Sequence, residues 1–536
     1  MSAGPTRVLV LGLDAASPEL LEAWTADGTL PHLRSLTLRG TSGRLGGIEG
    51  FFVGSTWPTL YTGTGPGRHG FHYQLQIAPG SYDLQWSPAS DFVRTEPFWS
   101  ALERSGRRVA ALDVPLSRPA PGMSGVQVVE WGGHDAFFGF HTTPPELGRE
   151  LVRRHGLHPQ GTVCDARRTT VRDHREFLER LEAGIRAKVT WTGELLARGG
   201  WDLFAQVFTE GHCAGHQCWH LHDPTHPAHD PELAAALGDP LRRIYVALDA
   251  AVGELVASAG DAHVLVFTGH GMASWYGAQF LLRGILNRLG VTAAPRTRTG
   301  PRVRRIAERV WTRLPERLRA PIRAARAHLP AGPSAPARPD LRLHTDLERS
   351  LCFPLDNGQA VGGIRLNLAG REPGGRLAPG AEAEAFCAQL AADLCEIVDE
   401  RTGEPLVRAV RRTDALHAGE AQGHLPDLLV EWNDLVATGT TQLADGAGAT
   451  VRARSPKIGV VEGANDYGRT GEHRPGGWIV AVGPGVPHDR LKRVVPLTDL
   501  APTLAALVDA EMPQADGRPA PELLGERRAG ADPTRN

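Results

Sequence analysis

In the stretch Trp201-Asp-Leu-Phe-Ala-Gln-Val-Phe208, an apolar segment of strand length runs directly into Thr209-Glu-Gly-His212-Cys-Ala-Gly-His216. Metal-capable side chains directly after a buried strand are typical of a site at the carboxyl edge of an α/β sheet. His212 and His216 are four residues apart, so one helical turn places both imidazoles on the same face. A zinc-type ion accepts imidazole nitrogen readily. With 22 His in 536 residues, such a pair also arises by chance in a solvated loop, so other residues must decide between the two interpretations.

Three further segments have the composition of buried strands: residues 7–13, 108–114 and 262–268. They are apolar on both faces, and the first leads into a helical pattern from Pro18 to Asp27, which indicates a parallel sheet covered on both sides. We therefore expect an α/β fold with a mostly parallel central sheet and helices on both faces. Asp14 falls at the end of the first strand, where it either caps the next helix or binds a cation. His270 comes after the last strand in the same way.

The composition is that of an ordinary globular protein, with 41% hydrophobic and 22% charged residues. A net charge of -2 gives no reason to expect nucleic acid as a partner. The six Cys show neither paired zinc spacing nor a dense disulfide framework. Residues 1–7 do not resemble a signal peptide, and no apolar run reaches membrane-spanning length. These features predict a reduced, cytoplasmic protein.

One segment differs in kind from the rest. Residues 295–342 contain thirteen Arg against three acidic residues, with recurrent Pro. We interpret 1–294 and 343–525 as one catalytic core, 295–342 as a partly helical insertion, and 526–536 as a flexible tail. The insertion is either a solvated surface arm or a lid that docks an anionic ligand.

A second group of polar residues surrounds Pro58, which suits the first turn of a helix. Ser55 and Thr56 would then lie at the N-terminus of that helix. A hydroxyl there is either a cap or, beside a cation, an activated nucleophile.

Three motifs in order carry a family resemblance: Gly12-Leu-Asp14, Leu30-Pro-His-Leu33, and Thr62-Gly63 with Pro66-Gly-Arg-His69-Gly70 shortly after it. Together they resemble the alkaline phosphatase superfamily, and within it the type I phosphodiesterase/nucleotide pyrophosphatase branch. The resemblance runs from about residue 7 to 525 and leaves the insertion outside it. It implies the α/β fold expected above.

The resemblance also implies two zinc-like ions that clamp the oxygens of an in-line displacement at phosphorus. One ion would be held by His212, His216 and His473, with His212 at a position where the family has Asp. The other would be held by Asp14, His270 and the nucleophilic hydroxyl. Here Gly269 stands where the family has an Asp ligand.

The nucleophile is the second departure from the family pattern. Counting back from Thr62-Gly63 by the family spacing places it at Val53, which has no suitable group. Locally, however, Thr56-Trp-Pro58-Thr resembles the family's Thr-Phe-Pro-Asn. Thr56 or Ser55 is therefore the candidate nucleophile if the helix is shortened.

We expect a metal-dependent hydrolase, or a transferase, that acts on phosphate diesters, phosphoanhydrides or related phosphoryl or sulfuryl esters of small molecules. One Zn²⁺ is expected, and a second is an open alternative. With a single ion, an activated water would replace the hydroxyl nucleophile. The alternative hypothesis is a catalytically disabled relative that binds an anionic ligand or partner. Glu210 sits beside the pair and could contact a ligand histidine. The other histidines, such as His69, His72 and His220, could line the rim of the site or shuttle protons, but we expect most of them in surface loops.

Overall fold

The computed structural model describes residues 6–86, 93, 95–132, 136–161, 165–166, 168–275, 277–295, 341, 345–433, 450–464 and 468–525. Its central sheet has eight strands, in the order β2 (Thr41–Leu45), β19 (Gly477–Val482), β9 (His263–Thr268), β1 (Val8–Leu13), β8 (Leu203–Phe208), β5 (Val109–Leu112), β6 (Val126–Val129) and β7 (His141–Thr143). The pairings from β9 through β6 are parallel, whereas β19 and β7 run antiparallel to their neighbours. The expected α/β fold is confirmed.

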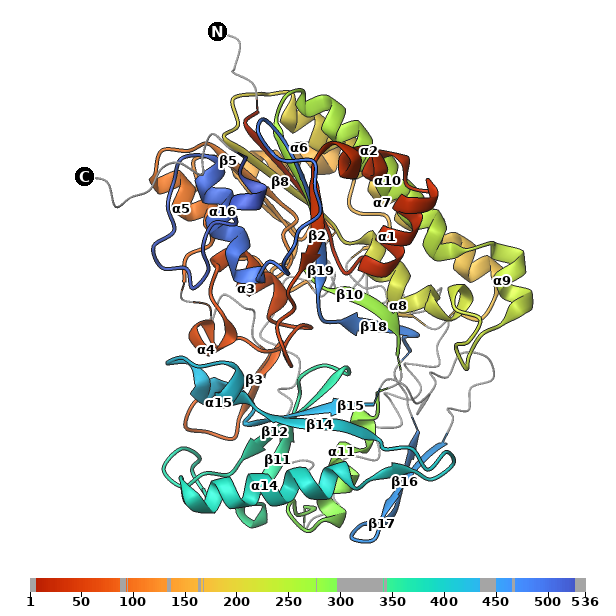
Figure 1. Cartoon of the computed structure of the whole chain (residues 1–536), viewed down its shortest axis with the longest axis vertical. Coiled ribbons are helices and arrows are strands. Elements are labelled where there is room, and N and C mark those ends of the chain that lie inside the picture. The colour runs from red at the N-terminus through yellow and green to blue at the C-terminus, as the bar shows by residue number, and fades with distance from the viewer. Residues whose placement is uncertain are drawn as a thin grey trace.

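Helices cover both faces of this sheet, and the alternation of side chains along β1 explains why. Leu9 and Leu11 point into one core, and Val8 and Val10 into the other. The first core is covered by α1 (Pro18–Asp27), α2 (Pro31–Arg39), α6 (Pro145–His155), α7 (Val171–Leu196) and α10 (Pro240–Ala259). The second is covered by α3 (Thr56–Thr62), α5 (Phe98–Arg104) and α16 (Leu500–Leu507), on the opposite side of the sheet in Figure 1.

A second, smaller lobe lies below the sheet in Figure 1. It contains an antiparallel sheet in the order β11 (Cys352–Leu355), β12 (Val361–Leu366), β15 (Leu428–Trp432) and β14 (Val407–Arg412). Beside it are α11 (Gln279–Arg288), α14 (Ala381–Cys395), β13 (Val398–Asp399), β16 (Thr450–Ser455) and β17 (Gly459–Ala464). These elements share a hydrophobic core of their own. The periodicity of the sequence did not separate this lobe from the main sheet.

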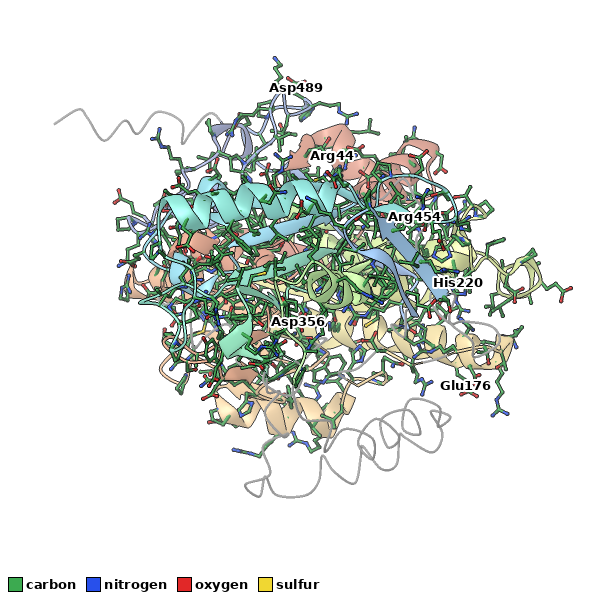
Figure 2. The ribbon with its side chains drawn as sticks, turned by 90° about the horizontal axis from the view of Figure 1, so that it is seen from below. Arg44, Glu176, His220, Asp356, Arg454 and Asp489 are labelled. Atoms are coloured by element: carbon green, nitrogen blue, oxygen red, sulfur yellow. The ribbon has the colours of Figure 1, made fainter. Side chains whose placement is uncertain are left out.

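Short elements complete the described chain. They are α4 (Pro66–His69), β3 (Leu75–Ile77), β4 (Leu84–Trp86), α8 (Glu210–His222), α9 (Pro231–Leu237), β10 (Gly271–Ser274), α15 (Thr413–Leu416) and β18 (Gly471–Arg474). In Figure 1, α8, β10 and β18 lie between the central sheet and the smaller lobe. None of the described helices is long and apolar enough to cross a bilayer. Exposed charges such as Glu176 and Asp489 project from the periphery in Figure 2.

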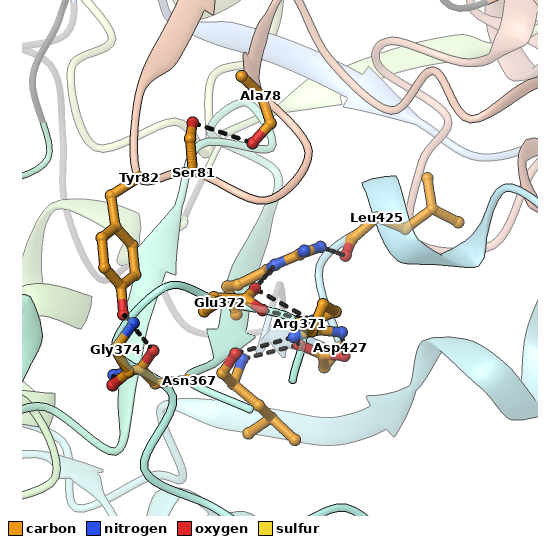
Figure 3. A network of polar contacts seen from close by, with 11 residues as sticks. Ala78, Ser81, Tyr82, Asn367, Arg371, Glu372, Gly374, Leu425 and Asp427 are labelled. Carbon is orange, nitrogen blue, oxygen red and sulfur yellow. Dashed lines mark hydrogen bonds and ion pairs between the residues drawn. The ribbon is translucent and has the colours of Figure 1, made fainter. Parts of the chain in front are cut away.

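The segment after β12 has a structural role in the smaller lobe. The Arg371 guanidinium donates to both carboxylate oxygens of Asp427, each at 2.7 Å (Figure 3). Glu372 accepts from Arg365 at 2.6 Å and from Arg371 at 2.8 Å. Tyr82 donates to Asn367 at 2.7 Å and ties the β3–β4 hairpin to the same region. Buried charges require such pairing, because each would otherwise lose its hydration without compensation.

The predicted tail lies outside the described residues. Of the predicted insertion, 295–342, only residues 295 and 341 are described. The assignment of these segments stays a prediction.

The charge network makes a testable prediction about stability. Replacing Glu372 by Gln should lower the free energy of unfolding by about 3 kcal/mol, because Arg365 would keep a buried charge without its carboxylate. Urea denaturation would measure the change. The matched control is Glu462→Gln on the exposed edge of β17, which should leave stability unchanged. Equal stability of the two variants would contradict a structural role for the network.

Candidate metal centre

Three neighbouring strands deliver polar residues to the same edge of the central sheet. Asp14 comes directly after β1, the Thr209–His212 segment comes after β8, and His270 lies two residues after β9. β9, β1 and β8 are adjacent and parallel. Their carboxyl ends therefore meet at one edge, as the sequence predicted, and this is where open α/β sheets bind ligands.

Helix α8 presents the histidine pair. Thr209 precedes the helix, and its hydroxyl donates to Gly132 O at 2.5 Å, which ties the start of α8 to the segment after β6. Glu210 stands in the first turn, where an acidic residue interacts favourably with the helix dipole. His212 and His216 come next on one face, and both are buried. The predicted helical turn through the pair is confirmed by the structure.

Strand β18 brings the third histidine to α8. It pairs with β10, and His473 lies opposite Met272 in that ladder. A side chain at position 215 would overlap Met272 Sδ, and one at position 471 would overlap the Gly215 carbonyl. Glycine at both positions therefore permits the close approach of the β10–β18 pair to α8. The Thr470 N–H donates to His216 O at 2.8 Å and fixes the register between the two elements.

The three histidines converge through their Nε2 atoms. His212 Nε2 lies 3.2 Å from His473 Nε2 and 3.2 Å from His216 Nε2. Three nitrogens each about 2.0 Å from one tetrahedral ion lie about 3.3 Å apart. His216 Nδ1 lies 2.8 Å from Gly471 O and donates to it, which leaves the Nε2 lone pair of the neutral ring facing the cluster. The donor set and its spacing therefore fit a zinc-type cation.

Two charged groups that the sequence did not single out border this cluster. Arg469 Nη1 lies 3.0 Å from His216 Nε2, while its other nitrogens make a bidentate contact with Asp165 at 2.8 Å each. Glu472 is 1% exposed, and burial raises its pKa. Glu472 Oε1 lies 3.7 Å from His473 Nε2. No spacing motif marks these residues, because their role arises from how β18 packs.

Residues 8–437 match the family model for type I phosphodiesterase / nucleotide pyrophosphatase. The chain belongs to this family. It is therefore an enzyme of the phosphodiesterase and pyrophosphatase class, and the family depends on metal ions. No functionally curated protein is similar enough in sequence to match the chain.

Two solved structures illustrate what the chain is similar to. Phosphonoacetate hydrolase from Sinorhizobium meliloti 1021, in complex with phosphonoacetate, aligns with a TM-score of 0.50 at 12% identity, covering 95% of this chain and 96% of that chain. Murine ectonucleotide pyrophosphatase / phosphodiesterase 5 in complex with AMP aligns with a TM-score of 0.44 at 12% identity, covering 96% and 97% of the two chains. At 12% identity, the likeness to the phosphonoacetate hydrolase shows the fold alone.

Asp14 and His270, the residues expected to hold a second ion, lie near each other in this phosphodiesterase-family chain. Asp14 Oδ1 accepts a hydrogen bond of 2.8 Å from Trp57 Nε1 and lies 3.9 Å from His270 Nε2. Burial lowers the pKa of His270 to about 3, so its ring is neutral at physiological pH. The His270 ring packs against the histidine cluster, with 4.6 Å between the ring centroids of His270 and His473. Gly269 contributes no ligand.

Both candidate hydroxyls are buried at the start of α3, but they point differently. Ser55 donates to Phe71 O at 2.6 Å, and Thr56 donates to Phe52 O at 2.8 Å. A β-carbon at Gly269 would lie 2.8 Å from Thr56 Cγ2, so Thr56 stands beside the residue that precedes His270. Val53 instead lies next to Gly358 of the smaller lobe. The Thr56 methyl group therefore faces position 269, whereas its hydroxyl is turned to Phe52 O.

A pocket of about 310 Å³ lies between the main sheet and the smaller lobe. Its lining includes the aromatic residues Phe52, Trp275 and Trp432. Its charged residues are three arginines and two glutamates, a net charge of +1: Arg408, Arg411, Arg474, Glu49 and Glu431. Arg474 is the residue after His473, and the Phe52 carbonyl accepts from Thr56. The size of the pocket suits a small ligand, and none of the three histidines of the cluster is among its lining residues.

Two expectations about neighbouring residues were wrong. The Glu210 carboxylate contacts Lys188 at 3.3 Å and His158 at 3.0 Å, instead of a ligand histidine. His69, His72 and His220 are buried, although surface loops were expected. Each is enclosed by packing between elements distant in sequence, which local composition does not reveal.

The buried His69 predicts acid sensitivity. Its Nδ1 accepts from Phe71 N–H at 3.1 Å, so its Nε2 donates to Thr59 Oγ1 at 3.1 Å, and burial lowers its pKa to about 3. The unfolded chain, with a His pKa of about 6.5, binds the proton first as the pH falls. The contribution of the His69 ring to the free energy of unfolding is therefore full above about pH 6.5. It is lost as the pH falls from there towards 3.

We expect the thermal midpoint to fall between pH 7 and pH 5, and His69→Gln to reduce the slope of that fall. Scanning fluorimetry would measure the thermal midpoint at each pH. A chelator in the buffer removes any contribution from cation release. His141→Gln, at an exposed position, is the control and should keep the wild-type slope. Identical slopes in all three proteins would refute the assignment.

Proposed function

We propose that this protein is a zinc-dependent hydrolase of phosphate diesters, phosphoanhydrides or phosphonates, with its principal cation held by His212, His216 and His473. The convergence of the three Nε2 atoms supports this proposal most directly. When bound, such a cation polarises a phosphoryl oxygen and lowers the pKa of a coordinated water to about 7.

The remaining groups suit the binding of an anion. Arg469 is held by Asp165, so its guanidinium is oriented before a substrate arrives. A planar guanidinium matches the non-bridging oxygens of a phosphoryl group. The pocket between the main sheet and the smaller lobe carries one net positive charge, which also suits a small anionic ligand. A phosphonate or a nucleotide has this chemistry, and such ligands are bound by the two structural neighbours above.

Asp14 and His270 have two compatible roles. They can hold a second, weaker cation, or they can orient the substrate and carry protons without one. The indole donor on Asp14 favours weak cation binding, because it already satisfies one carboxylate oxygen. We assign Thr56, and not Ser55, as the nucleophile, because the Thr56 side chain lies beside Gly269. Both hydroxyls donate to backbone carbonyls, so the Thr56 hydroxyl has to rotate away from Phe52 O before it attacks.

Loss of one histidine should remove both the cation and the activity. In His216→Ala, we expect zinc content to fall from about one ion per chain to near zero, with turnover of bis(4-nitrophenyl) phosphate lost in parallel. Elemental analysis and a colorimetric assay measure the two quantities. His222→Ala is the matched control on the same helix, because His222 pairs with Asp239. Bound zinc without turnover in the wild-type protein would instead favour a ligand-binding relative.

The nucleophile can be tested separately. Thr56→Ala should lower kcat by about 10³-fold or more, because an attacking hydroxyl is lost, whereas Ser55→Ala should keep most of the activity. Thr56→Ser preserves a hydroxyl and should retain measurable turnover. If Thr56→Ala instead turns over at the wild-type rate, water attacks directly and no hydroxyl of α3 takes part.

A further inference from the structure

The Arg469 guanidinium contacts an atom that a bound cation would also require. Its Nη1 lies 3.0 Å from His216 Nε2. Because His216 Nδ1–H donates to Gly471 O at 2.8 Å, the Nε2 atom of the neutral ring carries a lone pair, and Arg469 Nη1 donates to it. The same Nε2 atom lies 3.2 Å from His212 Nε2 and belongs to the three-histidine cluster. A lone pair binds one strong partner at a time, so Arg469 and a cation compete for His216.

The guanidinium is held in place from its other side. Arg469 Nε and Nη2 each donate to one oxygen of Asp165 at 2.8 Å, and the third nitrogen, Nη1, is directed at the cluster. Asp165 also accepts from Gln217 of α8 at 3.4 Å, and Arg469 is only 8% exposed. While the arginine keeps this place, a cation about 2.0 Å from His216 Nε2 lies within about 5 Å of Nη1.

The charges around this contact favour an anion that touches both groups. Imidazoles bind a cation in their neutral form, so the three histidines offset none of its charge, and Asp165 is engaged by the guanidinium. The buried Glu472 carboxylate also lies near Arg469, but its Oε1 already accepts the N–H of His473 at 2.9 Å. A phosphoryl anion has several oxygens, so one can meet the cation while another accepts from Nη1. Such an anion removes the repulsion between the two positive groups.

We propose that Arg469 couples cation binding to anion binding in this site. The arginine competes with the cation for His216 Nε2, and an anion that accepts from Nη1 relieves this competition. The cation and the anion therefore each strengthen the binding of the other, by the same factor. The anion is a small one with at least two unesterified oxygens on phosphorus, as in inorganic phosphate or a phosphonate. The proposal rests on the three-histidine centre of the proposed function.

The first test measures the zinc affinity of the wild-type protein with and without inorganic phosphate. A fluorescent chelator competes for zinc and buffers its free concentration, and chloride at equal ionic strength replaces phosphate in the reference buffer. We expect phosphate to raise the zinc affinity by about 10-fold, a factor typical of coupling between two sites. By reciprocity, zinc should raise the phosphate affinity by the same factor in isothermal titration calorimetry.

The second test removes the arginine. Without phosphate, Arg469→Met should bind zinc about 10-fold more tightly than wild type, because the charged donor that competes for His216 Nε2 is gone. The phosphate effect should fall to about threefold or less, the part that direct contact between anion and cation supplies. Adding Asp165→Asn to this variant should change neither result, which excludes the unpaired carboxylate as the cause. Arg452→Met is the matched control on β16, where Arg452 pairs with Glu400 at 2.7 Å, and should keep the wild-type values.

The outcomes distinguish this proposal from the one on which it rests. If the wild-type protein takes up no zinc, the three-histidine centre itself is wrong. If it binds zinc but phosphate changes the affinity by less than twofold, the centre stands and the coupling is wrong. Weaker zinc binding by Arg469→Met, or an undiminished phosphate effect in it, would also overturn the coupling. Arg469→Lys, which keeps the charge but loses the planar fork, should show a reduced phosphate effect and replaces the methionine variant if that does not fold.

Discussion

The close approach of α8 and β18 is the contact on which the metal centre depends. The pair on α8 could form without it, but His473 comes from a segment more than 250 residues away from His212 in sequence. Gly215 and Gly471 remove the side chains that would hold the two elements apart, and the bond from Thr470 N–H to His216 O sets their relative position. Rigid placement of ligands by secondary structure is what makes a cation site selective.

The electrostatics of the centre are a consequence of that packing. Arg469 and Glu472 both lie within four residues before His473, so the segment that completes the histidine cluster also carries one cation and one anion to it. The arginine is oriented by Asp165, and the glutamate is shielded from water. In such a low-dielectric site, fixed charges act more strongly on an incoming anion than they would in solvent.

Sequence predicted the parts of this arrangement that depend on local pattern. The apolar segments before Asp14, His212 and His270 could be identified as strands, and adjacent parallel strands bring the residues at their carboxyl ends to one edge of the sheet. The smaller lobe was not anticipated, because β15 has the composition of any buried strand. Trp57 and Arg469 were missed because their partners, Asp14 and His216, lie 43 and 253 residues away in sequence. Glu472 is 1 residue from its partner His473, but no spacing rule links the two.

The two departures from the family pattern are physically coupled. Thr56 Cγ2 lies where a side chain at position 269 would begin, so an aspartate at 269 would overlap with Thr56 in this arrangement. With Thr56 in this position, glycine is the residue that fits at 269 without a shift of the Thr56 side chain. Trp57 follows Thr56 in the same helix, and its indole reaches Asp14. The indole donor and the Thr56 methyl group thus lie beside Asp14 and Gly269, the positions at which the sequence predicts a second cation or departs from that pattern.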